Sequence, residues 1–209
     1  MEKVLLIGGG AHCASVIDTM NQQAFYEPVG ILDIPEKIGK SILGVPIVGT
    51  DSDMRKYFKQ GIQLVFITLG NTVLRERLAK EAKQIGFEFP IIIDPSSIVS
   101  LHTNIGVGSF IGKGAILNNT VVIGEHAIIN SGAIIDHDGQ IGDYVHVAPG
   151  ATLSGHVTIG NRTHVGTNAT IIQNVEIGED AMIGAGSVVL KDIASGRKAY
   201  GNPCKEVYS

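Results

Sequence analysis

The sequence of 209 residues predicts two folds in one chain, a small α/β domain followed by an all-β parallel β-helix. Two observations indicate this. Apolar runs alternate with polar, helix-favouring stretches up to residue 95, and aliphatic residues then recur at every sixth position from Ile105 to Val189. Strands that alternate with helices form parallel sheets, whereas a strict six-residue period is the signature of a β-helix. We therefore expect an α/β domain at 1–95, a β-helix at 96–190 and a capping tail at 191–209.

The first 95 residues contain the elements of half a Rossmann-like fold. Four apolar runs predict parallel strands at 4–7, 29–32, 64–69 and 90–93. Polar segments with apolar residues at helical spacing predict helices at about 12–24, 51–60 and 72–85. In such a sheet, ligands bind beyond the carboxyl ends of the strands.

A glycine-rich turn, Gly8-Gly9-Gly10-Ala11-His12, links the first strand to the first helix. Exposed amides and the helix dipole favour an anion there, although a dinucleotide fingerprint would need a glycine at the position of Cys13. Further polar or small residues follow two other strands on the same edge. We expect this edge to bind substrate through Gly10, His12, Asp33, Gly70 and Asn71, whereas each residue alone is equally compatible with a capping or exposed loop role.

The six-residue repeat has three distinct columns. Small or β-branched residues lie four positions after each aliphatic residue, as the crowded interior of a narrow prism requires, and glycine often follows the aliphatic residue directly, which we attribute to a positive φ at a tight corner. The fifteen aliphatic residues are Ile105, Ile111, Leu117, Ile123, Ile129, Ile135, Ile141, Val147, Leu153, Ile159, Val165, Ile171, Ile177, Ile183 and Val189.

Polar residues interrupt the repeat at Asp136-His137-Asp138. A histidine beside a carboxylate gains basicity and can take a proton from an attacking amine or alcohol, so His137 is the candidate general base and Asp138 its partner. The alternative is a solvated corner histidine. Asn130 stands where neighbouring repeats carry glycine, and either orients a substrate or fills a left-handed turn position.

His146 and His164 are eighteen residues apart, which is one coil if each coil holds three hexapeptides, so they should stack on one face. Together with His137 they raise the alternative of a zinc site built from imidazoles of adjacent chains. The two cysteines, Cys13 and Cys204, form no spaced metal pair and are expected to be reduced thiols.

Composition excludes several classes. The formal charge of −4 gives no basic footprint for nucleic acid. The four apolar residues after Met1-Glu2-Lys3 are too few for a signal peptide or a membrane span, so we expect a cytoplasmic protein that does not insert into membranes.

Nearly the whole chain resembles a family of bacterial hexapeptide acyltransferases. The resemblance rests on four motifs in this order: the glycine turn, Leu69-Gly70-Asn71, Asn130 and Asp136-His137-Asp138. This family includes sialic acid O-acetyltransferases and N-acetyltransferases of nucleotide sugars. The resemblance implies a left-handed β-helix and a homotrimer with active sites between subunits. It also implies acetyl-CoA as cosubstrate, no metal, and a sugar nucleotide held by the N-terminal domain.

Carried over residue by residue, the resemblance implies that His137 is the base, Asp138 raises its basicity and Asn130 contacts the substrate. His146 would lie near the thioester, and Gly166, Thr167, Ala185 and Gly186 along the pantetheine arm. Gly10, His12, Asp33, Gly70 and Asn71 would bind the sugar nucleotide. Ala11 and the pair Ile34-Pro35 depart from the family pattern, which leaves the nucleotide open.

These observations predict transfer of acetyl from acetyl-CoA to the amino group of a nucleotide-linked 4-amino-4,6-dideoxy sugar in a ternary complex. The alternatives are a sialic acid O-acetyltransferase, a zinc hydratase and a non-enzymatic nucleotide-binding solenoid. The sequence leaves the sugar and the nucleotide undetermined.

Overall fold

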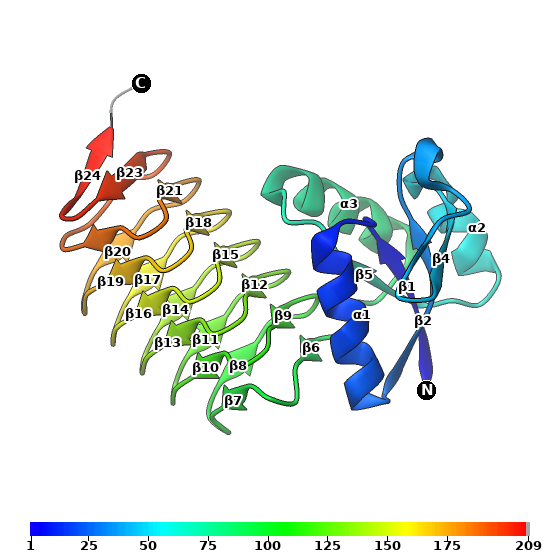
Figure 1. Ribbon diagram of the computed structural model, residues 1–209, viewed down its shortest axis with the longest axis horizontal. Helices are drawn as coiled ribbons and strands as arrows, with labels where there is room; N and C mark the ends of the chain where they lie inside the picture. Colours follow the sequence, from blue (N-terminus) through cyan, green and yellow to red (C-terminus); the bar gives the residue numbers. More distant parts are fainter. Residues whose placement is uncertain (208–209) are drawn as a thin grey trace. The chain divides into compact units, whose positions relative to one another are not determined.

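The computed structural model describes residues 1–207, which form two compact units (Figure 1). The first spans Met1–Pro95, and the second begins at Ser96. No helix among residues 1–207 combines the length and the apolar composition that crossing a membrane requires.

The first unit is built on a five-stranded sheet with the order β3-β4-β2-β1-β5 (Figure 1). Strands β1, β2, β4 and β5 are parallel, and β3 is antiparallel to β4. The side chains of Leu5 and Leu6 from β1 and of Phe66 from β5 are fully buried in its core. The elements of this unit are β1 (Glu2–Ile7), α1 (Ala11–Gln23), β2 (Tyr26–Leu32), η1 (Pro35–Lys37), β3 (Ser41–Ile42), β4 (Val45–Gly49), η2 (Asp51–Asp53), α2 (Met54–Lys59), β5 (Leu64–Ile67), α3 (Thr72–Ile85) and β6 (Ile92–Ile93).

The helix over 72–85 has the predicted bounds, and α1 differs from its prediction by one residue at each end. The sheet differs from the prediction in two respects. The hairpin β3–β4 was not predicted, because its turn places Leu43 at φ 45°, which a leucine rarely adopts, and because Pro46 lowers the strand signal. The run at 90–93 was expected in this sheet, but β6 is not one of its strands, and the sheet ends at β5 on one side and at β3 on the other.

The second unit is a parallel β-helix with three faces (Figure 1). Within this unit the first face contains β7-β10-β13-β16-β19-β22, the second β8-β11-β14-β17-β20, and the third β9-β12-β15-β18-β21-β23-β24. Residues eighteen apart are paired, as His146 is with His164, so one coil is three hexapeptides. The strands are β7 (Ile98–Val99), β8 (Asn104–Ile105), β9 (Phe110–Ile111), β10 (Ile116–Leu117), β11 (Val122–Ile123), β12 (Ile128–Ile129), β13 (Ile134–Ile135), β14 (Gln140–Ile141), β15 (His146–Val147), β16 (Thr152–Leu153), β17 (Thr158–Ile159), β18 (His164–Val165), β19 (Thr170–Ile171), β20 (Glu176–Ile177), β21 (Met182–Ile183), β22 (Val188–Val189), β23 (Lys198–Gly201) and β24 (Cys204–Val207).

The interior follows the predicted columns. Of the fifteen periodic aliphatic residues, all except Ile105 are buried, and every residue of the small column from Ser109 to Ser187 is buried as well. Each buried strand residue stacks on its equivalent in the next coil, so the core is one continuous apolar column.

The reason given above for the glycine column is wrong. Positive φ occurs three residues after the aliphatic residue, at Gly108, Asp138 and Arg162 among others, and not at the glycine that follows it directly. That glycine is required by close packing between coils. A Cβ on Gly106 would lie 2.5 Å from the backbone carbon of Gly124.

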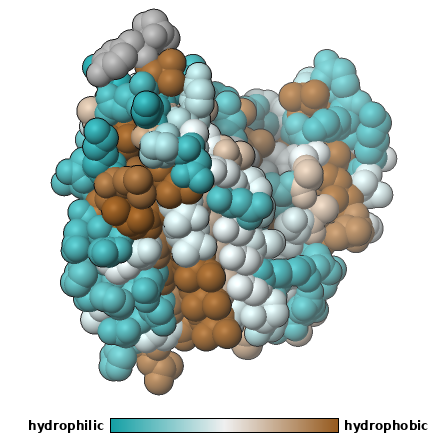
Figure 2. All heavy atoms as spheres, turned by 60° about the vertical axis from the view of Figure 1, so that its left-hand side comes forward, coloured by the Kyte–Doolittle hydropathy of each residue, from teal (hydrophilic) through white to brown (hydrophobic). Residues whose placement is uncertain are grey.

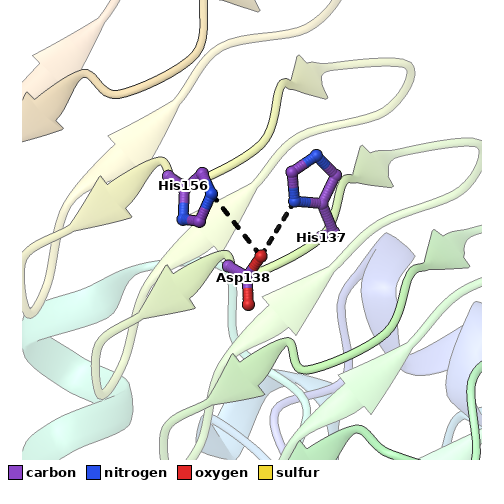
Figure 3. A group of neighbouring side chains, drawn as sticks. All are labelled: His137, Asp138 and His156. Atoms are coloured by element: carbon purple, nitrogen blue, oxygen red, sulfur yellow. Dashed lines mark hydrogen bonds and ion pairs between the residues drawn. The ribbon is translucent and has the colours of Figure 1, made fainter.

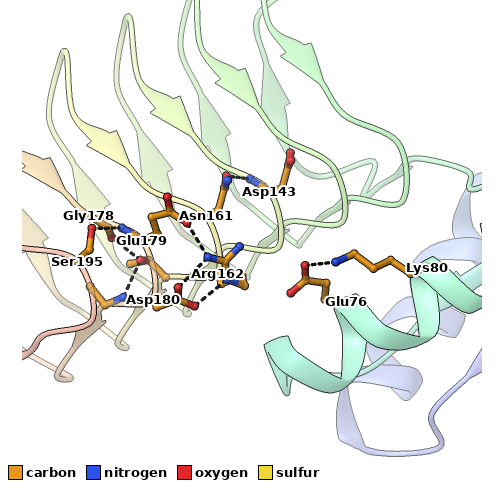
Figure 4. Close-up of polar contacts among 11 residues, drawn as sticks. Glu76, Lys80, Asp143, Asn161, Arg162, Gly178, Glu179, Asp180 and Ser195 are labelled. Atoms are coloured by element: carbon orange, nitrogen blue, oxygen red, sulfur yellow. Dashed lines mark hydrogen bonds and ion pairs between the residues drawn. The ribbon is translucent and has the colours of Figure 1, made fainter.

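The turns between the strands form three rows. The first corner row follows β10, β13, β16 and β19 and joins the first face to the second; the second follows β11, β14 and β17; the third follows β12, β15, β18 and β21 and joins the third face to the first. In the second row, polar side chains link successive coils (Figure 4). Arg162 bonds Asp180 and Glu179 of the next coil, and Asn161 accepts a hydrogen bond from the amide of Asp143.

The C-terminal segment forms a hairpin of β23 and β24, and β23 continues the third face by pairing with β21. The surface of the molecule is not uniformly polar. Figure 2 shows apolar side chains gathered in patches between hydrophilic regions. The large apolar side chains that the second unit exposes include Ile98, Leu101, Met182, Leu190 and Tyr200.

Candidate active site

His137 and Asp138 lie in the first corner row, in the turn between β13 and β14, and their side chains meet (Figure 3). The Nδ1 atom of His137 is 2.9 Å from Oδ2 of Asp138. The other carboxylate oxygen of Asp138 accepts a hydrogen bond of 2.7 Å from the Thr120 hydroxyl, one coil earlier. An ionised carboxylate only accepts, so Nδ1 of His137 carries the proton and its Nε2 presents a lone pair.

The electrostatics of this pair favour a basic imidazole. The hydrogen bond with Asp138 raises the pKa of His137. The hydrogen bonds from Thr120 and then from His137 lower the pKa of Asp138, which keeps this carboxylate ionised. Both side chains are exposed to about the same degree, 46% for His137 and 40% for Asp138, so a substrate can reach them.

Asp136 orders the same turn. Its carboxylate accepts hydrogen bonds from the backbone amide of His137 and from the side chain of Asn118, and the first of these is the main cause of its lowered pKa. Asp136 therefore fixes the backbone from which His137 projects.

Sequence reasoning missed two neighbours of His137, both on the next coil. Nε2 of His156 lies 3.6 Å from Oδ2 of Asp138 (Figure 3). Gly155 lies under the imidazole, since a Cβ there would be 2.5 Å from Cε1 and 2.6 Å from Nε2 of His137. The signal was present in the eighteen-residue period, because Gly155 and His156 are one coil after His137 and Asp138. Among the described residues, His137, Asp138 and His156 are the group whose ligand atoms lie close enough to share a metal ion.

His146 and His164 stack on the third face as predicted, with ring centroids 4.8 Å apart. The Nε2 atom of His146 is 3.3 Å from the side-chain amide nitrogen of Asn130. Asn130 does not have a positive φ, so the left-handed alternative for it is wrong. Its Oδ1 instead accepts a hydrogen bond from the amide of Ser131.

His146 and His137 lie on opposite sides of the β-helix. Nine residues separate them, which is half of an eighteen-residue coil. The first corner row joins the first and second faces, so it is the corner opposite the third face, on which β15 places His146. One chain therefore does not bring His146 and Asn130 to His137.

Gly166, Thr167, Ala185 and Gly186 lie in the third corner row on two consecutive coils. The amide of Gly186 donates a hydrogen bond of 2.8 Å to the carbonyl of Thr167, and a Cβ on Gly166 would lie 2.6 Å from the amide nitrogen of Ala185. Thr167, Ala185 and Gly186 are exposed. These residues form a strip of accessible backbone beside the histidines of the third face.

In the first unit, Asp33 organises the glycine turn. Its Oδ2 accepts hydrogen bonds from the amide of Gly9 at 2.7 Å and from Lys37 at 2.8 Å, and its Oδ1 accepts one from the amide of Ile34. Burial alone would raise the pKa of Asp33, but the hydrogen bonds from Lys37, Ile34 and Gly9 lower it. The ionised carboxylate of Asp33 therefore stabilises the glycine turn.

A pocket of about 370 Å³ opens beside Asp33. Asp33 is the predicted substrate residue that lines it; Gly10, His12, Gly70 and Asn71 do not. The side chain of Asn71 caps α3 by accepting a hydrogen bond from the amide of Leu74. Residues that the sequence did not single out complete the wall, among them Thr50, Asp51 and Arg77. Thr50 and Asp51 follow β4, the strand that was not predicted, and Arg77 lies in α3.

His12 is a neutral imidazole. Burial, and then the positive charge of Arg75, lower its pKa to about 4. Arg75 is itself buried and donates hydrogen bonds to the carbonyls of Leu69 and Gly70. Arg75 thus fixes the loop after β5, which carries Gly70.

Each of the two units matches a known protein family. Residues 3–82 match the PglD N-terminal domain, and residues 156–191 match the bacterial transferase hexapeptide repeat. None of the curated proteins compared with the chain matches it.

Solved structures match over the whole chain. A perosamine N-acetyltransferase from Caulobacter crescentus, solved in complex with CoA and GDP-perosamine, is 35% identical with a TM-score of 0.95, covering 100% of this chain and 98% of that one. The acetyltransferase domain of PglB from Neisseria gonorrhoeae is 30% identical with a TM-score of 0.94, covering 99% and 100%. WeeI from Acinetobacter baumannii, at 24% identity, a TM-score of 0.86 and coverage of 99% and 100%, shares the fold. The chain therefore belongs to the hexapeptide-repeat sugar acetyltransferases that carry a PglD-type N-terminal domain.

Proposed function

We propose that this enzyme transfers acetyl from acetyl-CoA to the amino group of a nucleotide-linked 4-amino-4,6-dideoxy sugar. The observation that carries the proposal is the pair formed by His137 and Asp138, which leaves a basic Nε2 open to solvent. The relatives support the choice of substrates, since one is a perosamine N-acetyltransferase bound to CoA and GDP-perosamine and another was solved with acetyl coenzyme A.

In the proposed reaction Nε2 of His137 removes a proton from the amine of the sugar as its nitrogen attacks the thioester carbonyl. The C–N bond forms, the C–S bond breaks, and the thiol of CoA leaves with a proton that His137 returns. Asp138 stabilises the imidazolium that forms in between. A covalent acetyl-enzyme is not required, and neither cysteine suits one. Burial raises the pKa of Cys13 to about 11 and also raises that of Cys204, so both remain thiols.

For the sugar nucleotide, the pocket beside Asp33 and the glycine turn supply a hollow with polar groups at its rim. For acetyl-CoA, the backbone strip of Thr167, Ala185 and Gly186 next to His146 offers exposed amides and carbonyls without bulky side chains. These two assignments follow the family resemblance, and they are supported by Asp33, which lines the pocket, and by the exposure of Thr167, Ala185 and Gly186.

We further propose that the enzyme works as a homotrimer in which each active site combines His137 of one chain with the third face of its neighbour. His137 and His146 lie half a coil apart on one chain, so they can serve one substrate only when they come from two chains. The exposed apolar side chains of the β-helix are suited to contacts between copies.

The substrate assignment is tested by incubating the enzyme with acetyl-CoA and a panel of acceptors while thiol release is followed. The panel contains UDP-, GDP- and CMP-linked 4-amino sugars, their 4-hydroxy counterparts and free sialic acid. We expect release only with a nucleotide-linked amine. Release with sialic acid alone would establish O-acetylation, and no release with any acceptor would contradict the proposal.

The shared site is tested with His137→Ala and His146→Ala. We expect His137→Ala to lower kcat by roughly a hundredfold or more while CoA binding, measured by calorimetry, persists. Co-expressing the two variants in equal amounts should restore roughly a quarter of wild-type activity, because half of the sites receive an intact His137 and half of those an intact third face. Mixed oligomers that stay as inactive as the separate variants would show that each site belongs to one chain.

A further inference from the structure

We propose that His137, Asp138 and His156 form a zinc site that switches the enzyme off. The three side chains offer two imidazole nitrogens and one carboxylate oxygen, the ligand types that zinc prefers. Their ligand atoms lie within 4.8 Å of one another. The inference rests on the proposed function only for its inhibitory consequence, since zinc binding is measurable without any reaction.

The two distances from Asp138 to the imidazoles are close to the separations between ligand atoms in a zinc site. Zinc bonds of roughly 2.0 to 2.1 Å at tetrahedral angles place neighbouring ligand atoms about 3.3 Å apart. The two separations from Oδ2 of Asp138 lie on either side of this value, at 2.9 Å to His137 and 3.6 Å to His156. The second distance is too long for a hydrogen bond, and the three ligand atoms lie within 4.8 Å of one another, so the two imidazoles have to move toward each other when one ion binds all three.

Hydrogen bonds also fix the backbone of His156 and the orientation of the Asp138 carboxylate. His156 is fixed to the coil below by a backbone hydrogen bond of 3.0 Å from its amide to the carbonyl of His137. Thr120 bonds the other oxygen of Asp138 and so turns Oδ2 toward the two imidazoles. The three side chains are 40% to 57% exposed, so an ion can enter from solvent and keep water as its fourth ligand.

Inhibition follows from the tautomer of His137. Without metal, Nδ1 carries the proton and faces Asp138, and Nε2 holds the lone pair that the proposed reaction uses. A metal bound at Nδ1 displaces that proton, and the neutral ring then carries its proton on Nε2. The ring is no longer able to accept the proton of the sugar amine.

The test is a titration of chelator-treated, dialysed enzyme with zinc chloride, followed by calorimetry, with acetyl transfer measured in parallel. We expect one zinc per chain, and loss of activity over the same zinc range with recovery on adding a chelator. His156→Gln should bind zinc at least tenfold more weakly, and the ratio of its activity with zinc to its own activity without zinc should stay near one. His102→Gln, an exposed histidine outside the cluster, is the matched control and should behave as wild type.

Undiminished zinc binding by His156→Gln would overturn the site. Loss of zinc binding in His164→Gln would overturn it as well and place the ion at the His146–His164 pair. Binding without inhibition would refute the tautomer argument. A failure of the proposed function is seen separately, as absence of acetyl transfer by the zinc-free enzyme.

Discussion

Substitution of Gly155 by alanine tests whether the position of the His137 ring sets the rate. The added Cβ would lie 2.5 Å from Cε1 and 2.6 Å from Nε2 of His137, whereas ordinary contacts begin at 3.4 Å. The ring must therefore move by about 1 Å, and displacements of that size cost roughly a hundredfold in rate. We expect kcat to fall about a hundredfold, which corresponds to about 2.7 kcal/mol in the activation free energy.

The assay is steady-state thiol release with saturating acetyl-CoA and sugar nucleotide, accompanied by thermal unfolding. Gly155 is not among the glycines with positive φ, so alanine fits its backbone and the unfolding temperature should not fall. Gln173→Ala, the exposed residue at the same position one coil later, is the matched control and should keep wild-type kcat. Full activity in a folded Gly155→Ala enzyme would refute the argument that the position of the His137 ring sets the rate.

Two further substitutions test the carboxylates. Asp138→Asn removes the group that raises the pKa of His137, so that pKa should fall; the acidic limb of the kcat/KM profile should shift to lower pH and the plateau should drop, whereas an unmoved limb would exclude the pairing. Asparagine tolerates the φ of 59° at this position, so the fold should persist. Asp33→Ala removes a charged acceptor of the Gly9 amide and should lower the free energy of unfolding by about 1.5 to 3 kcal/mol and raise KM for the sugar nucleotide. Because the folded-state pKa of Asp33 is lowered, its stabilisation is present above the ordinary carboxyl pKa near 4 and is lost as pH falls toward the folded value, so wild type and variant should converge in acid.

The β-helix could be predicted from the sequence because each position repeats one environment fifteen times. The aliphatic column and the small column each have one physical cause, burial in a narrow prism, and both were confirmed. The glycine column has the same regularity, but the sequence does not distinguish a positive φ from a close approach between coils. The close approach between coils is seen only in the folded structure, where a Cβ on Gly106 would strike Gly124.

The α/β unit was less predictable because the hairpin that precedes part of its pocket wall has an atypical sequence for a hairpin. The hairpin β3–β4 turns through a leucine with positive φ and carries Pro46, and both features argue against a hairpin. Because β4 was not predicted, part of the candidate binding site was missed as well. The wall of the pocket beside Asp33 includes Thr50 and Asp51, which directly follow β4, so overlooking that strand concealed them.

The number of residues per coil determines which side chains of the β-helix can contribute to one active site. With eighteen residues per coil, positions eighteen apart stack, which brings Gly155 and His156 to His137 and Asp138, whereas positions nine apart lie on opposite sides, which separates His137 from His146. The eighteen-residue period therefore places the polar residues around His137 on one side of the β-helix and those around His146 on the opposite side. A site that uses both sets has to be completed by a second chain, so oligomerisation is part of the proposed chemistry.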